Sequence, residues 1–314
     1  MFGIARAMRA RGIMGINRRA DYTLGWNPRH LYPLVDDKLR SKRLAIDAGI
    51  AAPALLGAIE IERHARDFQR FLGEHEDFVI KPAHGSGGDG ILVITGTVNE
   101  RYRKANGTVI EPWRVSRHIS NILSGMFSLG GQSDVAMLEA RVEPDPLFAE
   151  ISYEGVPDIR VIVHRGIPVM AMVRLPTRMS DGKANLHQGA IGVGIDMATG
   201  VTTHGVCDEQ SVDEHPDTGK PVSGVAIPEW DNLLWRATRC QDITGLGYMG
   251  VDIVLDAEHG PLVLELNARP GLNIQIANRE GLNRRLEAIR DLTDPESWCA
   301  EDRVAYAREH FGEA

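Results

Sequence analysis

The chain has 314 residues, of which 43% are hydrophobic and 25% are charged, and its formal net charge is -8. This composition is typical of a globular protein with one large domain or two to three lobes, and the negative charge argues against a nucleic-acid-binding protein. No stretch reaches the roughly 18 consecutive apolar residues of a membrane span, and the N-terminus lacks the layout of a signal peptide. Three scattered cysteines show no metal-binding spacing, so we expect a reducing compartment and hence the cytoplasm.

The N-terminal region is basic, although the chain as a whole is acidic. Residues 2–11 could form a small basic amphipathic helix, which more often docks against its own domain than anchors a protein in a membrane. An irregular region with two prolines follows. Asp36 can then cap a helix that continues to Ala48, and Gly49 closes it.

The segment from Phe78 to Ile94 predicts two short buried strands joined by a glycine-rich loop. Lys81 stands at the exit of the first strand. Glycine lets backbone N–H groups turn toward phosphate oxygens, and a lysine adds a point charge. The segment is not a P-loop, which needs a Gly-Lys-Ser/Thr run that opens a helix. By itself it fits either a polyphosphate-binding hairpin or a hairpin turn with a surface lysine. The loop glycines are Gly85, Gly87, Gly88 and Gly90.

Hairpins and separate helices make up the rest of the predicted elements, which indicates an α+β fold rather than a doubly wound parallel sheet. The clearest helix begins at Pro228 and ends at Gly245, with apolar residues at helical spacing. The other predicted elements are helices over 60–72, 115–123 and 295–311, a strand from 135 that runs into a turn at 144, hairpins over 158–174 and 251–266, and a polar loop over 176–189.

Two carboxylates and a carboxamide interrupt the last predicted hairpin. The strand period of two puts Glu265 and Asn267 on one face, and Asp252 interrupts the partner strand. Such groups are costly to bury unless they are paired or bound to a metal, and three oxygen ligands suit Mg²⁺. The alternative is a solvated outer face. The Pro270-Gly271 pair ends the strand beside these residues, which favours the metal site.

In their order along the chain, seven segments resemble the signature of ATP-grasp carboxylate–amine ligases. They are Asp37-Lys38-Leu-Arg-Ser-Lys42, Val79-Ile-Lys81-Pro-Ala-x-Gly-Ser-x-Gly, Glu139, Asp158-Ile-Arg160, Asn185-x-x-x-Gly189, Gly250-Val-Asp252-Ile and Glu265-x-Asn267-x-x-Pro270-Gly271. Several of them are most similar to the α-L-glutamate ligases that add glutamate to protein or peptide ends. The run over 174–189 resembles a branch related to the ribosomal-protein glutamate ligases.

The resemblance implies an ATP-grasp fold, in which two α+β lobes clamp ATP. A basic segment over 1–35 would precede an N-lobe over 36–138, which carries the glycine loop as a lid. A C-lobe over 139–314 would carry an adenine hinge and the metal site. Family members usually have a folded domain before the Asp-Lys helix, and it helps to build the acceptor site. Here the short basic segment replaces that domain, or a partner protein or second subunit does.

Site residues follow from the same resemblance. The nucleotide would be bound by Lys38, Lys81, Gly85, Ser86, Gly87, Gly88, Gly90, Glu139, Ala140, Val142 and Glu143. Of these, the two lysines would contact phosphates, Glu139 and the backbone after it would face the adenine, and Glu143 would face the ribose. The metal ligands would be Asp252, Glu265 and Asn267, holding one or two Mg²⁺ ions, with Mn²⁺ as a substitute. The γ-phosphate and acyl-phosphate side would carry Arg160, Arg174 and Asn185, and the substrate side Arg178, Lys183 and Gly189.

The implied function is an ATP-dependent ligase that activates a carboxylate as an acyl phosphate and joins it to an amine. The substrates would be amino acids, peptides or a protein tail, with glutamate as the first candidate. The cationic residues of the 160–183 region favour an acidic substrate. Two other hypotheses stay open: a catalytically silent nucleotide-binding partner protein, and a kinase-like phosphotransferase on the same fold.

Overall fold

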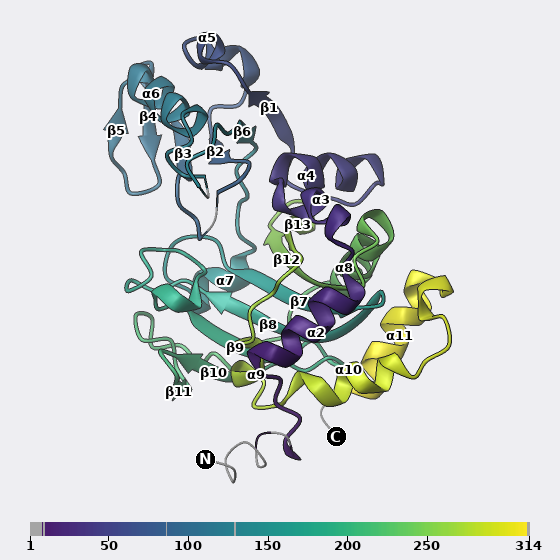
Figure 1. Ribbon diagram of the computed structural model, residues 1–314. Coiled ribbons are helices and arrows are strands. Elements are labelled where there is room, and N and C mark those ends of the chain that lie inside the picture. Colours follow the sequence, from purple (N-terminus) through teal and green to yellow (C-terminus); the bar gives the residue numbers. More distant parts are fainter. Residues whose placement is uncertain (1–7, 9, 86, 129, 313–314) are drawn as a thin grey trace. The chain divides into compact units, whose positions relative to one another are not determined.

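The computed structural model describes residues 8, 10–85, 87–128 and 130–312. The chain divides into two compact units (Figure 1). Unit 1 comprises Met1–Asp36, Ser41–Ala51 and Glu143–Ala314, and unit 2 comprises Asp37–Arg40 and Ala52–Val142. The division into an N-lobe and a C-lobe expected from the sequence, with its boundary after residue 138, stays a prediction. The helix expected over 2–11 lies mostly outside the described residues.

Unit 2 is built on an antiparallel six-stranded sheet with the order β1-β6-β2-β3-β4-β5. Its longest helix, α6 (Pro112–Leu123), packs on β2 and β6 through the buried residues Val115, Ile119 and Ile122, which follow helical spacing. The strands are β1 (Leu55–Ile59), β2 (Phe78–Pro82), β3 (Leu92–Val98), β4 (Arg101–Lys104), β5 (Val109–Ile110) and β6 (Ala136–Glu139), and the shorter helices are α5 (Glu62–Ala65) and the 3₁₀ helix η2 (Phe68–Phe71).

Unit 1 is built on an antiparallel seven-stranded sheet with the order β11-β10-β9-β8-β7-β12-β13. Its central strands are buried apolar runs, against which α8, α10 and α11 pack. The strands are β7 (Asp158–His164), β8 (Ile167–Leu175), β9 (Ile191–Ile195), β10 (Thr202–Cys207), β11 (Gln210–Val212), β12 (Tyr248–Asp256) and β13 (Gly260–Asn267). The α-helices are α2 (Ile16–Trp26), α3 (Pro33–Asp36), α7 (Pro146–Ile151), α8 (Trp230–Thr244), α9 (Ile274–Ala277), α10 (Leu282–Arg290) and α11 (Ala300–Phe311). The 3₁₀ helices are η1 (Arg29–Leu31), η3 (Leu186–Gln188) and η4 (Pro295–Ser297).

Helix α4 (Lys38–Asp47) has its first turn in unit 2 and its remainder in unit 1. The sequence placed its cap at Asp36, and this was wrong by one residue. Asp37 Oδ1 accepts hydrogen bonds from the backbone N–H groups of Leu39 (2.9 Å) and Arg40 (3.1 Å). The α+β prediction is confirmed by two antiparallel sheets with separate helices.

The other helix predictions differ from the structure at their ends. The helix expected over 60–72 is two short turns, α5 and η2, and the helix expected from 295 begins with the separate turn η4. Helix α6 begins three residues before the expected start, at Pro112, because proline suits the first helical position. The end of α8 at Gly245 is confirmed, where the glycine has a φ of +68°.

The basic N-terminal segment is part of the unit 1 fold. Asn27 is buried and donates from Nδ2 to the carbonyl oxygens of Tyr248 (2.6 Å) and Ala268 (3.0 Å), while its Oδ1 accepts from the N–H of Tyr248 (2.9 Å). Gln275 pairs with both backbone groups of Met14 in the same manner. The segment is thus tied to the backbone at the start of β12 and just after β13.

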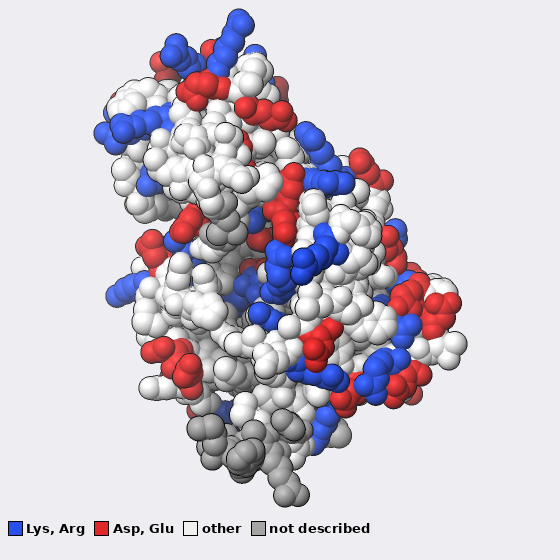
Figure 2. All heavy atoms as spheres, in the orientation of Figure 1, with Lys and Arg blue, Asp and Glu red and all other residues white. Residues whose placement is uncertain are grey.

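Charged side chains of both signs are interspersed on the visible face of the molecule (Figure 2). None of the described helices is both long enough and apolar enough to cross a bilayer.

His164, at the end of β7, is expected to make stability depend on pH. Its ring is fully buried among Tyr22, Trp26 and Tyr248, and Nδ1 bonds to the Gly247 carbonyl oxygen (2.7 Å). Burial lowers the pKa of His164 to about 4 from its ordinary value of 6.5. Above pH 6.5 the ring is neutral in both the folded and unfolded states. As the pH falls toward 4 the unfolded state takes up the proton first, so the free energy of unfolding should drop by about 3 kcal/mol.

Urea unfolding at pH 7 and at pH 5, followed by tryptophan fluorescence, measures about 2 kcal/mol of this drop. Four of the five tryptophans lie in unit 1. In His164→Asn, which keeps an N–H donor near Gly247 but does not titrate, the difference between the two pH values should shrink. An unchanged difference in this variant would assign the acid sensitivity to other groups.

Candidate functional site

The predicted metal ligands lie together on one face of the unit 1 sheet. In the antiparallel pair β12–β13, Asp252 is opposite Glu265, and Gly250 is opposite Asn267. Opposite residues share a face, and so do residues two apart in one strand. Asp252 is buried, whereas Glu265 and Asn267 are half-buried. Asn267 Oδ1 also accepts from the N–H of Arg269 (2.8 Å), at the turn that follows the strand.

The same face continues onto β7 and β8 with two arginines and a third acid. Arg160 is opposite Asp252 and binds it through two hydrogen bonds of 2.7 and 2.6 Å. Arg174 is opposite Asp158 and binds it through two hydrogen bonds of 2.5 Å, with a third to Asp252 Oδ2 (2.8 Å). The structure therefore brings both predicted catalytic arginines beside the predicted metal ligands. Each arginine is paired with an acid.

Burial and the two arginines set the ionisation of these acids. Burial by itself would raise the pKa of Asp252, but the guanidinium groups of Arg160 and Arg174 outweigh it and hold this pKa at about 2. Burial raises the pKa of Asp158 to about 6, and the charge of Asp252 adds to the rise while Arg174 opposes it. Asp252 is therefore an anion at neutral pH.

The donor set fits a hard divalent cation. Asp252 and Glu265 are like charges on opposite residues, an arrangement that is destabilising unless a cation compensates it. Three carboxylates and two guanidiniums lie in this row. Asp252 Oδ1 accepts one hydrogen bond and keeps a lone pair. The described residues contain no cluster of three His, Cys, Asp or Glu side chains placed to bind a metal, so the fit depends on two carboxylates and the Asn267 carboxamide.

In unit 2, a buried ion pair joins Lys81, which was predicted to contact a phosphate, to Glu139, which was predicted to face the adenine. Lys81 Nζ lies 2.8 Å from Glu139 Oε2, and their side chains are 7% and 3% exposed. The residues come from the neighbouring strands β2 and β6. The N–H of Ala140 bonds to the Ala54 carbonyl oxygen (2.9 Å). Val142 is buried at the end of unit 2.

Glu143 begins the next stretch of unit 1, where the turn between β12 and β13 holds its backbone. Its N–H bonds to Asp256 Oδ2 (2.9 Å), and its carbonyl oxygen accepts from the N–H of Ala257 (2.8 Å). Asp256 also accepts from the N–H groups of Glu258 and His259. The residue predicted to face the ribose therefore lies on a fixed backbone.

The glycine loop is held at both ends within unit 2. At its start, Lys38 Nζ donates to the Gly85 carbonyl oxygen (2.6 Å). At its end, His118 Nε2 bonds to the Gly90 carbonyl oxygen (2.8 Å), and Phe127 packs so closely that a Cβ on Gly90 would lie 2.6 Å from its ring. Gly87, Gly88 and Gly90 have φ values of 66°, 82° and 78°, which other residues rarely adopt. Ser86 lies outside the described residues.

We expect the amides of Gly87, Gly88 and Gly90 to exchange hydrogen quickly without nucleotide and slowly with it. A glycine-rich backbone has many accessible conformations, and phosphates that engage its N–H groups would restrict them. Hydrogen–deuterium exchange with and without a saturating ATP analogue and Mg²⁺ measures this, with the β3 amides as an internal reference. Loop exchange that nucleotide leaves unchanged would contradict phosphate binding here.

The predicted substrate residues lie on the loop after β8. Arg178 is exposed, and its guanidinium carbon lies 5.1 Å from the centre of the Tyr153 ring. Its backbone N–H donates to Asp217 Oδ2 (2.7 Å). Asn185 caps η3 by accepting from the N–H of His187 (3.0 Å). Gly189 has a φ of +99°, and Lys183 is half-buried. Arg160 and Arg174 are paired with acids and therefore add little net positive charge to the cationic cluster expected from the sequence.

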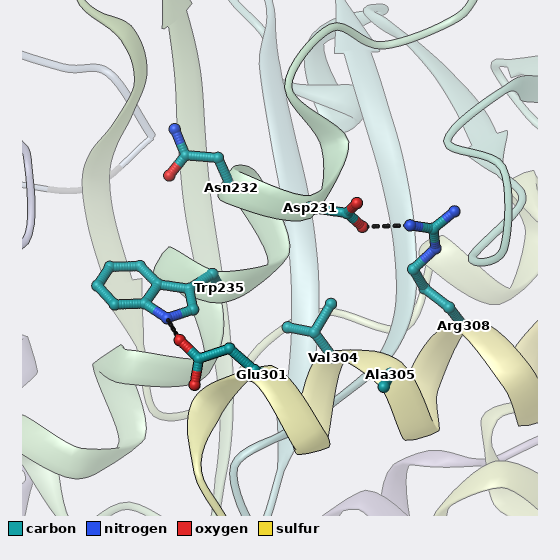
Figure 3. A pocket seen from close by; sticks show the side chains of 7 residues that line it. All are labelled: Asp231, Asn232, Trp235, Glu301, Val304, Ala305 and Arg308. Atoms are coloured by element: carbon teal, nitrogen blue, oxygen red, sulfur yellow. Dashed lines mark hydrogen bonds and ion pairs between the residues drawn. The ribbon is translucent and has the colours of Figure 1, made fainter.

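A surface depression elsewhere in unit 1 contains none of the predicted site residues. It lies between α8 and α11 (Figure 3), where Trp235 Nε1 donates to Glu301 (2.9 Å) and Asp231 forms an ion pair with Arg308. Its polar rim is paired within the protein, and Val304 and Ala305 contribute apolar atoms. We attribute it to helix packing.

Sequence reasoning gave no role to Asp158, His84 or Asp134, which the structure places beside predicted site residues. Asp158 had a usable signal, because an acid two residues before Arg160 on an apolar strand shares its face. The pairing of His84 with Asp134 joins residues 50 positions apart, and no local pattern in the sequence indicates it.

Comparison with known proteins decides the family. A family model described as "Sugar-transfer associated ATP-grasp" matches residues 17–291. The chain belongs to this family. This ATP-grasp protein is 26% identical over 236 residues to a probable alpha-L-glutamate ligase from Maridesulfovibrio salexigens, a match that covers 75% of the chain and 56% of the relative. It is 25% identical over 302 residues to a cyanophycin synthetase from Crocosphaera subtropica, covering 83% of the chain and 30% of the relative.

A solved structure shows the same fold. The crystal structure of a biotin carboxylase–beta-gamma-ATP complex from Campylobacter jejuni matches with a TM-score of 0.51 and 14% identity, over 85% of this chain and 49% of that one. The ATP-grasp prediction is thus confirmed for family and fold. The ATP-grasp protein spans only 56% and 30% of the two curated relatives.

Proposed function

We propose that this protein is an ATP-dependent carboxylate–amine ligase. The observation that carries the proposal is the charged row on the unit 1 sheet. Asp252, Glu265 and Asn267 lie in register on one face, with Arg160 and Arg174 beside them. Carboxylates held ionised next to guanidinium groups suit a site that transfers a phosphoryl group through charge compensation alone. Membership of the ATP-grasp family and similarity to a glutamate ligase support the same class.

The reaction needs no enzyme nucleophile. A substrate carboxylate attacks the γ-phosphorus of ATP, which forms an acyl phosphate and releases ADP. An amine then attacks the acyl carbon, which forms the amide and releases phosphate. Mg²⁺ held by Asp252, Glu265 and Asn267 would neutralise phosphate charge. Lys38 and Lys81 would contact the phosphates and Glu139 the adenine, while Arg160, Arg174 and Asn185 would face the transferred group.

The proposed substrates are an amino acid or peptide on each side, with glutamate as the first candidate for the added amine. Exposed Arg178, supported by Tyr153 and Asp217, offers a guanidinium for a substrate carboxylate. Lys183 and Gly189 lie on the same loop.

The experiment that tests the function measures ADP release across a panel of amino acids and peptides, with mass spectrometry of the products. Amide formation together with ADP supports the ligase. A phosphorylated product without an amide would indicate a kinase-like reaction, and ATP binding without any turnover would indicate a nucleotide-binding partner protein.

Arg178→Ala is expected to raise the KM for acidic substrates about tenfold to a hundredfold and to leave the KM for ATP unchanged. A guanidinium–carboxylate pair contributes about 1.5–3 kcal/mol, which corresponds to that range. Arg178→Lys should retain part of the affinity, and Arg29→Ala, which removes an exposed arginine elsewhere in unit 1, is the control. Equal wild-type rates with neutral and acidic substrates would remove the acidic-substrate proposal and leave the ligase proposal standing.

A further inference from the structure

His84 and Asp134 form a pair beside the glycine loop that the proposed function does not use. Asp134 has a fully buried side chain, and its Oδ1 lies 2.8 Å from Nδ1 of His84. Both of its oxygens also accept from the backbone N–H of His84, at 3.2 and 3.1 Å, and Oδ1 accepts from the N–H of Val135 at 2.7 Å. This carboxylate thus fixes the backbone and the ring of His84 together.

The pairing determines which edge of the imidazole faces outward. A carboxylate accepts, so Nδ1 carries the proton that is donated to Asp134, and the ring presents Nε2 on its other side. The His84 side chain is 46% exposed, and Nε2 forms no hydrogen bond to any residue that the structure describes. Asp37 Oδ2 is 3.9 Å from Nε2, which is too long for a hydrogen bond. A buried carboxylate therefore orients an exposed ring by its Nδ1 edge and leaves Nε2 on the opposite edge.

The position of this nitrogen relates it to the predicted phosphate contacts. His84 directly precedes Gly85, whose carbonyl oxygen accepts from Lys38 Nζ (2.6 Å), and the N–H of Lys38 bonds to the Ala83 carbonyl oxygen (3.0 Å). The first turn of α4 and the start of the glycine loop therefore converge on His84 within unit 2. Asp37 Oδ1 is engaged in capping that turn.

We propose that His84, oriented by Asp134, is a nucleotide-binding residue that donates a hydrogen bond from Nε2 to a phosphate oxygen of ATP. The inference rests on the proposed function, because it requires the glycine loop to hold the triphosphate. In the complex Nδ1 would donate to Asp134 and Nε2 to the phosphate, next to the contact between Lys38 and the start of the loop. Asp134 is a positioning residue, since it acts through the ring.

The test measures the dissociation constant of a non-hydrolysable ATP analogue with Mg²⁺ by calorimetry. His84→Ala should weaken binding about tenfold to a hundredfold, as expected for a charge-assisted hydrogen bond. The informative variant is His84→Asn, whose amide can still donate to Asp134 but has no atom at the Nε2 position. It should bind as weakly as His84→Ala. His75→Ala, which changes an exposed histidine in the same unit, should bind like wild type.

Three results would overturn the proposal. Wild-type affinity in His84→Asn would show that the ring serves only as a bond to Asp134, with the ligase proposal intact. A ¹⁵N resonance of His84 Nε2 that does not move when the analogue is added would exclude contact with the phosphate. A wild-type protein that does not bind the analogue would remove this inference together with the proposed function.

Discussion

Glu265→Gln is expected to abolish ADP formation, with a loss of at least about a thousandfold in kcat, while the protein stays folded. Glu265 is half-buried opposite Asp252, and the substitution removes one charge with almost no change in shape. Loss of one anionic ligand beside transferring phosphates removes several kcal/mol of charge compensation. The protein should stay folded because the glutamine side chain has nearly the same shape as glutamate.

The measurement pairs an ADP-release assay with urea unfolding of the same preparation. Glu258→Gln, which changes an exposed glutamate in the turn of the same hairpin, is the matched control and should retain wild-type turnover. Calorimetry with Mg²⁺ and an ATP analogue should show weaker metal-dependent binding in the Glu265 variant alone. Normal turnover in Glu265→Gln would show that the metal assignment is wrong.

Asn27→Ala is expected to lower the free energy of unfolding of unit 1 by about 3 kcal/mol. The side chain is 1% exposed and makes three hydrogen bonds, to both backbone groups of Tyr248 and to the carbonyl oxygen of Ala268. Alanine would leave these buried groups without their partner, and each unsatisfied group costs about 1–3 kcal/mol, partly relieved by water. Residue 268 directly follows Asn267, so the KM for Mg²⁺ should rise as well.

Asn17→Ala provides the control, because Asn17 is exposed on α2 in the same N-terminal segment. Its free energy of unfolding should stay within about 0.5 kcal/mol of wild type. Urea denaturation monitored by tryptophan fluorescence measures both variants. Equal stability of the two would mean that the N-terminal segment contributes little to holding unit 1 together.

Much of the fold was predictable because local signals and the hydrophobic pattern agreed. Helix α8 follows from apolar residues at helical spacing and from Gly245, and the β12–β13 hairpin follows from two apolar runs around a turn. The helix expected over 60–72 failed because its residues form two separate short turns whose buried members, such as Phe68, pack in the unit 2 core. Short polar segments depend on such tertiary contacts, which periodicity does not reveal.

The predicted metal ligands could be found together because they occupy one hairpin, where register follows from alternation. The residues that pair with these ligands could not be predicted from the sequence. Arg160 and Arg174 were expected to face phosphates, yet each holds an acid on a neighbouring strand, since strand order places β7 between β8 and β12. Asp134 reaches His84 only through the pairing of β2 with β6 and the backbone beyond it. Such contacts depend on which strands are neighbours in the folded sheet, and the sequence pattern of a single strand does not reveal this.

Unit 1 is formed by residues up to Asp36, by Ser41–Ala51 and by all residues from Glu143 onward. This order has a consequence for synthesis on the ribosome. Every residue of unit 2 has been made once Val142 is added, so unit 2 can fold while most of its host unit is still untranslated. The partners of Asn27, in contrast, lie 221 and 241 residues later in the chain. The basic N-terminal segment must therefore wait, without its final contacts, until translation has passed Ala268. During that interval a chaperone could bind the segment before its contacts in unit 1 form.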